Sequence, residues 1–86
     1  MARTDFAEAL LAIEAELSPE LFNKLSSDLG NNSTFWDSEA CWAALYYWLE
    51  DNVGQDSSNG KSVKIYSILF DCSEEEMWKR FKDKGL

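Results

Sequence analysis

The chain has 86 residues and a formal net charge of -8 at pH 7, and 45% of its residues are hydrophobic. This length allows only one hydrophobic core, and an apolar fraction this large is typical of folded domains rather than of disordered segments. The sequence contains no histidine, so it lacks the usual general base and the commonest transition-metal ligand. We therefore expect a single small acidic domain over residues 1–86, not an enzyme, with no cofactor and no metal.

The charge is unevenly placed along the sequence. Residues 1–59 hold eleven acids and two bases, whereas residues 60–86 hold five acids and six bases. An acidic field repels phosphates and anionic lipids, so we expect no direct binding to nucleic acid or membranes. The start of the sequence lacks a signal-peptide pattern, and Cys41 and Cys72 are too few for a disulfide framework. The sequence thus predicts a cytoplasmic protein with a basic protein partner.

Apolar residues recur at helical spacing from residue 4 to residue 17. Four of them share one stripe: Phe6, Leu10, Ile13 and Leu17. The acids Glu8, Glu14 and Glu16 lie off this stripe, and Thr4 can cap the helix. The pattern predicts an amphipathic helix over residues 4–17.

A second helix is predicted over residues 19–29. Ser18 can serve as its N-cap, with Pro19 at the first helical position and Glu20 in the first turn. An apolar stripe follows and ends just before a glycine: Phe22, Leu25 and Leu29. Because the connection to the first helix is so short, we expect the two helices to pack together along one apolar seam.

A third helix is predicted to follow the polar turn of residues 31–34, with Thr34 or Asp37 as its cap and its end near Gly54. Residues 40–49 are apolar on every face of such a helix. A domain of this size cannot surround a helix completely, so part of its aromatic surface should remain exposed. This expectation concerns Trp42, Tyr46, Tyr47 and Trp48.

The segment 63–70 fits a helix or a strand. We favour the helix, because no second strand pattern is present to pair with it, and we keep the strand as the alternative. A final helix is predicted after the capping box of Ser73 and Glu76, with several bases towards its end. The sequence therefore predicts a mainly α fold, a compact bundle of four to five short helices.

Residues 54–62 form the longest loop signal and invite two ligand hypotheses. Gly54 to Ser62 resembles a phosphate-binding loop but has five residues between its glycines instead of four, and it follows a predicted helix instead of a strand. Asp51 to Gly60 offers oxygen ligands, yet no register of this segment matches a calcium-binding loop. We interpret the segment as a flexible, solvated connector.

Two sets of residues remain as candidate binding residues. One set is acidic and comes from residues 4–23, a segment that contains no base: Asp5, Glu8, Glu14, Glu16 and Glu20. The other set is aromatic and belongs to the third helix: Trp42, Tyr46, Tyr47 and Trp48. Acids often serve only solubility and aromatics often serve only the core, but aromatic residues also dominate binding hot spots.

Our hypothesis is a small acidic protein of the inhibitor or adaptor kind. Its negative helical face would engage a basic, nucleic-acid-binding surface of a protein target, as a nucleic-acid mimic does. The alternative is a homo-oligomeric regulatory domain, such as a homodimer, that associates through the aromatic third helix. A helix-turn-helix DNA binder built from residues 62–84 is a third possibility, which the net charge disfavours.

Overall fold

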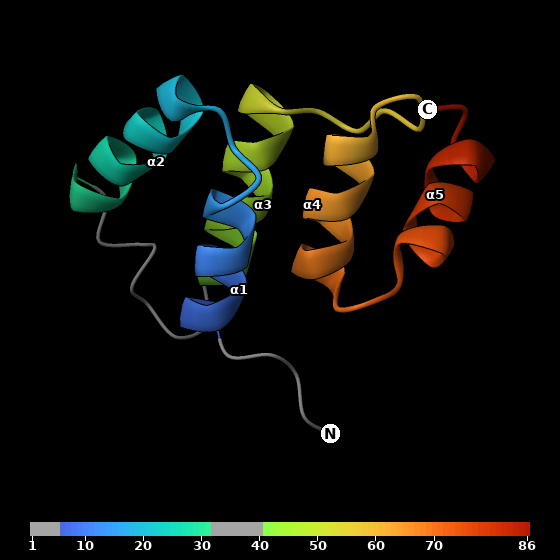
Figure 1. Cartoon of the computed structure of the whole chain (residues 1–86), viewed down its shortest axis with the longest axis horizontal. Coiled ribbons are helices and arrows are strands. Elements are labelled where there is room, and N and C mark those ends of the chain that lie inside the picture. Colours follow the sequence, from blue (N-terminus) through green and yellow to red (C-terminus); the bar gives the residue numbers. More distant parts are fainter. Residues whose placement is uncertain (1–5, 32–40) are drawn as a thin grey trace.

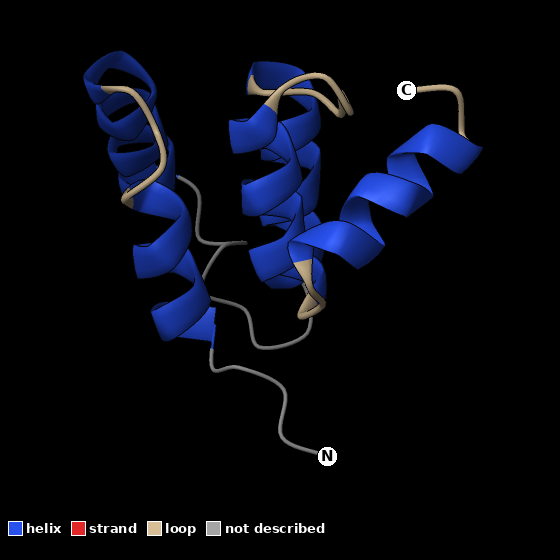
Figure 2. Ribbon diagram, turned by 45° about the vertical axis from the view of Figure 1, so that its right-hand side comes forward, coloured by secondary structure: helices blue, strands red, loops and turns tan. Residues whose placement is uncertain are grey.

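The computed structural model describes residues 6–31 and 41–86 and contains five helices there (Figure 1). These are α1 (Phe6–Glu14), α2 (Pro19–Asn31), α3 (Cys41–Asn52), α4 (Gly60–Phe70) and α5 (Glu74–Asp83). The described residues form no strand, and every regular element in Figure 2 is helical. The predicted mainly α bundle is confirmed, and the segment 63–70 is helical as we favoured.

The first two helices are joined by a tight turn. α1 ends at Glu14, earlier than predicted, because the N–H groups of Glu16 and Leu17 bond to carbonyls only three residues back, at 3.0 and 3.2 Å. α2 begins as predicted, since Ser18 Oγ accepts a hydrogen bond from the Leu21 N–H at 3.3 Å. The predicted cap Thr4 lies outside the described residues.

The predicted end of the third helix agrees with the structure. α3 ends at Asn52, and Gly54 follows with a φ of 80°, a backbone conformation that favours glycine. The Gly54 N–H donates to the Leu49 carbonyl at 2.9 Å, which satisfies one of the last carbonyls of the helix. The candidate caps Thr34 and Asp37 lie outside the described residues.

The last two helices both begin with a side-chain cap. α4 begins at Gly60, earlier than predicted, because Asn59 Oδ1 accepts from the N–H groups of Lys61 at 3.0 Å and Ser62 at 3.3 Å. α5 begins after Ser73, whose Oγ accepts from the Glu76 N–H at 3.1 Å, as the capping box predicted.

Helix α4 supplies the centre of the bundle and packs against both α5 and α1 (Figures 1 and 2). Its Tyr66 is fully buried, with its ring 5.5 Å from Phe81 of α5 and 6.3 Å from Tyr46 of α3. Apolar side chains from all five helices complete the core: Leu10, Ile13, Leu25, Leu45, Leu49, Leu69 and Met77. None of the described helices has the length and apolar character needed to cross a membrane.

Candidate functional site

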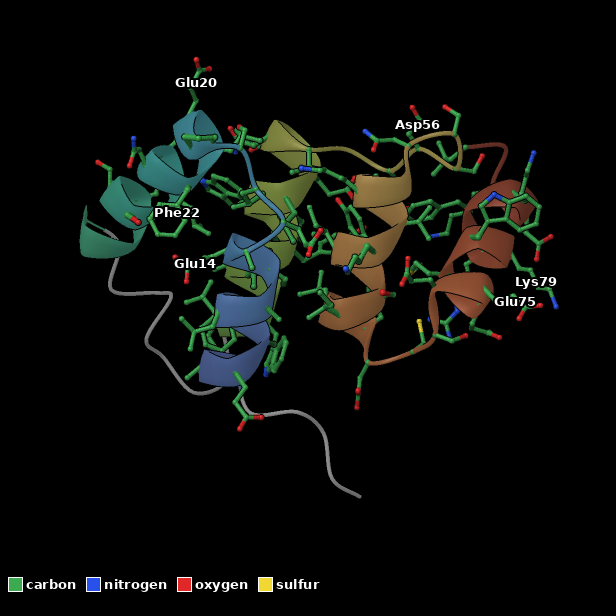
Figure 3. All side chains as sticks on the ribbon, in the orientation of Figure 1. Glu14, Glu20, Phe22, Asp56, Glu75 and Lys79 are labelled. Carbon is green, nitrogen blue, oxygen red and sulfur yellow. The ribbon has the colours of Figure 1, made fainter. Side chains whose placement is uncertain are left out.

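The ends of α1 and α3 and the beginnings of α2 and α4 meet at one end of the bundle (Figure 1). A depression there is lined by residues of the α1–α2 turn, α2, the end of α3 and the start of α4, among them Glu16, Ser18 and Asn52. We call this region the acidic end, after the six carboxylates of these segments and the loop that follows α3: Glu14, Glu16, Glu20, Glu50, Asp51 and Asp56. Figure 3 shows Glu20 and Asp56 pointing outward at this end.

The acids predicted as binding residues differ in their surroundings. Glu8 and Glu20 are exposed. Glu14 is half-buried, and this desolvation raises the pKa of its carboxyl. Glu16 is also half-buried and pairs with Lys64 of α4 at 3.3 Å. All three acids of the first predicted helix lie off its apolar stripe, but only Glu8 is exposed, whereas Glu14 and Glu16 are half-buried.

Two observations concern the predicted sets. Asp5 lies outside the described residues, and the other four acids lie on α1, in the turn after it and on α2. Trp48 is only 7% exposed, and its indole N–H donates to Asp28 Oδ2 at 2.6 Å, which ties α3 to α2. This burial argues against the binding role that the sequence suggested for Trp48.

The other three aromatic residues of the predicted set meet in a groove between α3 and α4. This aromatic groove has a volume of about 380 Å³ and is lined by Trp42, Ala43, Tyr46, Tyr47, Leu69 and Phe70. Tyr47 is 66% exposed, so the expectation of partial exposure is confirmed for this residue. Tyr46 lies between its neighbours, with its ring 5.6 Å from Tyr47 and 5.9 Å from Phe70 in edge-on contacts.

A hydrogen-bonded carboxylate lies next to the aromatic groove. Glu50, one turn beyond Tyr46, accepts hydrogen bonds at Oε1 from the Tyr66 hydroxyl at 2.5 Å and from Gln55 Nε2 at 2.7 Å. Burial, followed by this bond to an anion, strongly raises the pKa of Tyr66. Asp51 follows one turn beyond Tyr47 and is exposed. Two carboxylates therefore follow the groove aromatics along α3, each one helical turn beyond Tyr46 or Tyr47.

The bases of α5 are engaged within their own helix. Lys79 pairs with Glu75 at 3.9 Å, as Figure 3 shows, and Arg80 pairs with Glu76 at 3.4 Å. Lys82 Nζ lies 5.1 Å from the centre of the Trp78 ring. The helix-turn-helix alternative needs these bases for phosphates, so their local pairing weakens it further.

The loop after α3 uses its polar groups internally. Ser62 Oγ donates to the Gly54 carbonyl at 2.6 Å, and Asp56 Oδ1 accepts from the Ser58 N–H at 2.9 Å. The bonds from Ser58 lower the pKa of Asp56. Because Asn59 also caps the first amides of α4, the loop does not present the row of free N–H groups that a phosphate-binding loop requires.

Comparisons of the chain with protein-family models, with curated proteins and with solved structures found no match. We therefore infer its function from the acidic end and the aromatic groove. Sequence patterns missed the contribution of Leu69 and Phe70 to the groove and the role of Asp28, because both depend on contacts between distant segments. In the described residues, no three His, Cys, Asp or Glu side chains form a group that could hold a metal ion.

Proposed function

We propose that this protein is a non-catalytic binding protein, an inhibitor or adaptor that engages a basic surface of a protein target. One observation carries the proposal: before residue 60, the described residues include eight acids and a single base, Lys24. A surface of this composition attracts cationic partners over distances of about 10 Å at moderate salt.

The positions of the acids support a binding role over simple solubility. The last turns of α1 and α3 carry no base, although the C-terminal end of a helix is already negative. Glu14 and Asp51 lie in these turns, where each acid costs about 0.3–1 kcal/mol of stability. A partner that brings lysines or arginines to this end would relieve the repulsion. Violations of local rules of this kind are expected at functional sites.

The target we propose is a protein surface that otherwise binds nucleic acid. Lysines and arginines that select phosphates also form charge-assisted hydrogen bonds with carboxylates, so a carboxylate-rich surface can compete for them. We place this encounter in the cytoplasm, where Cys41 and Cys72 would remain reduced; neither forms a disulfide in the structure. The protein itself should not shift a nucleic-acid probe in a gel at low salt.

The test is the rate of association with a target captured on the immobilised protein. Raising ionic strength from about 0.05 to 0.5 M shortens the Debye length from roughly 14 to 4 Å, so association should slow much more than dissociation. The double variant Glu20→Lys and Asp51→Lys should bind about tenfold more slowly or worse. Its matched control is Glu74→Lys with Asp83→Lys, which changes the net charge equally in the first and last turns of α5.

Two results would count against this function. If both double variants lose binding equally, net charge alone attracts the partner and the acidic end is not a site. If short duplex DNA fails to displace the protein from its target, the target surface is not a nucleic-acid site and the mimic hypothesis is wrong.

The exposure of Tyr47 favours a second candidate function, self-association through α3 as a homodimer. Sedimentation equilibrium at concentrations from micromolar to millimolar separates the two. A dimer that dissociates on replacing Tyr47 with Ala would support the second candidate, and a monomer throughout would support the first.

A further inference from the structure

The aromatic groove leaves apolar surface in contact with solvent. Tyr47 is 66% exposed and Phe70 is 38% exposed, and they lie on the two helices that wall the groove. Phe70 rests on the core, since its ring stacks with that of the fully buried Tyr66 at a centre-to-centre distance of 6.3 Å. An open apolar groove on a preformed core is typical of a surface that binds another molecule.

The charges around the groove have one sign. Glu50 and Asp51 follow Tyr46 and Tyr47 by four residues each, so each acid lies one helical turn beyond a groove aromatic. Helix α3 contains no lysine or arginine. The negative end of its dipole adds to these two carboxylates.

The lysines of α4 contact the α1–α2 turn and its surroundings instead of the aromatic groove. Lys64 pairs with Glu16 of the α1–α2 turn, and Lys61 lines the depression that also contains Glu16 and Ser18. Neither lysine lines the aromatic groove. Among the described residues, the groove therefore combines an apolar floor with a negative end and no cation of its own.

From this combination we infer that the groove binds a cationic amphipathic helix of another protein. The inference rests on the proposed function, because it names the part of the basic partner that the chain holds. An apolar side chain of the partner would enter between Tyr47 and Phe70, and a lysine or arginine four residues away would reach Glu50 or Asp51. Both spacings are one helical turn, about 5.4 Å, so one helix can satisfy both.

A second copy of the chain fits this groove less well. A symmetric dimer through α3 would bury the same aromatic surface between two chains that are both acidic. Each copy carries a net charge of -8, so the repulsion would oppose association at low salt. A cationic helix removes this repulsion and buries the same aromatic surface.

The experiment uses the intact chain and a fluorescently labelled synthetic helix of leucines and lysines, with the leucines along one face. Tyr47→Ala should weaken binding by about tenfold or more, measured by fluorescence anisotropy. Leu11→Ala is the matched control, because Leu11 is 69% exposed on α1 and lies outside the groove. Ala43→Arg, which fills the groove and adds a cation, should abolish binding while circular dichroism shows an unchanged helix content.

Further arms decide the outcome. A peptide of the same composition in scrambled order should bind more weakly by a similar factor, and a peptide with glutamates in place of lysines should not bind. If Tyr47→Ala and Leu11→Ala behave alike, or if the scrambled peptide binds as tightly, the groove is not the site and the inference is overturned. In that case the proposed function stands if Asp51→Lys still weakens binding of the leucine–lysine helix. If Asp51→Lys has no effect on that binding, the proposed function fails together with the inference. A dimer that Tyr47→Ala dissociates would assign the groove to a second copy and would also overturn the inference.

Discussion

Helices α5 and α3 differ in how their charges are placed relative to the helix dipole. α5 has Glu74, Glu75 and Glu76 in its first turn and Arg80 and Lys82 in its last turn, so its charges match the helix dipole at both ends. α3 has no acid in its first turn, no base in its last turn, and two acids at the end where the dipole is already negative. The two helices have similar lengths, so length does not account for this difference.

The difference shows which helix depends on its neighbours. α5 buries only Met77 and Phe81 and pairs two of its bases with its own glutamates. α3 buries Leu45 and Leu49 on one side, but its opposite side remains apolar and partly open to solvent. A helix that satisfies its own charges can serve as packing alone, whereas a helix that does not is the better candidate for an interface.

The largest expected effect tests how α5 is held. Phe81→Ala should lower the free energy of unfolding by about 3–5 kcal/mol, because the fully buried Phe81 ring contacts Tyr66 at the centre of the core. Trp78→Ala, on the same helix but 42% exposed, is the control and should cost about 1 kcal/mol or less. Urea denaturation followed by circular dichroism measures both. Equal losses would mean that α5 is not anchored through Phe81.

A smaller effect sharpens the comparison of the two helix ends. Asp51→Lys should raise the free energy of unfolding by about 0.3–1 kcal/mol, because it places a cation at the negative end of α3. Arg80→Glu should lower it by a similar amount, since it removes a cation from the last turn of α5 and its pair with Glu76.

Salt provides the check on that pair of variants. Both effects are electrostatic and lie at the surface, so urea midpoints measured in 1 M NaCl should differ much less from the wild type than midpoints at low salt. If Asp51→Lys destabilises the protein at low salt, the acids of α3 have a structural role that the dipole argument does not include.

The smallest effect concerns Glu14, whose pKa is raised by desolvation. The folded state then binds a proton more readily than the unfolded state, so stability falls as the pH rises from the unfolded pKa through the higher folded pKa. Glu14→Gln should therefore stabilise the protein at pH 7, but not at about pH 3, where both states are protonated. The gain should stay at the low end of the roughly 0.3–1 kcal/mol that an acid costs at a helix C-terminus, because solvent screens a partly exposed carboxylate. Equal effects at both pH values would show that the gain does not come from ionisation.

The sequence predicted those features that depend on local chemistry. The caps Ser18 and Ser73 form as expected, because their hydrogen bonds reach only three residues along the chain. The start of α4 was placed too late, since glycine and serine at Gly60 and Ser62 are typical of loops and concealed the cap at Asn59.

The candidate site was harder to predict than the fold. In a run that is apolar on every face, helical periodicity cannot tell which side is buried, so Tyr47 and Trp48 looked alike in the sequence. Their difference comes from Asp28, which lies twenty residues from Trp48 and accepts its indole N–H. The ion pair between Glu16 and Lys64 was also missed, because the two residues are far apart in the sequence.

The hydroxyl of Ser62 has a consequence for the order of folding. It donates to the Gly54 carbonyl and accepts from the Asp56 N–H at 3.2 Å, so one buried side chain closes the loop between α3 and α4. Closing a loop of roughly ten residues takes only about 10–100 ns and costs little chain entropy. We expect the α3–α4 hairpin to be part of the folding nucleus, with α2 docking later. Stopped-flow kinetics of Ser62→Ala would then show mainly slower folding, and a change confined to the unfolding rate would contradict this order.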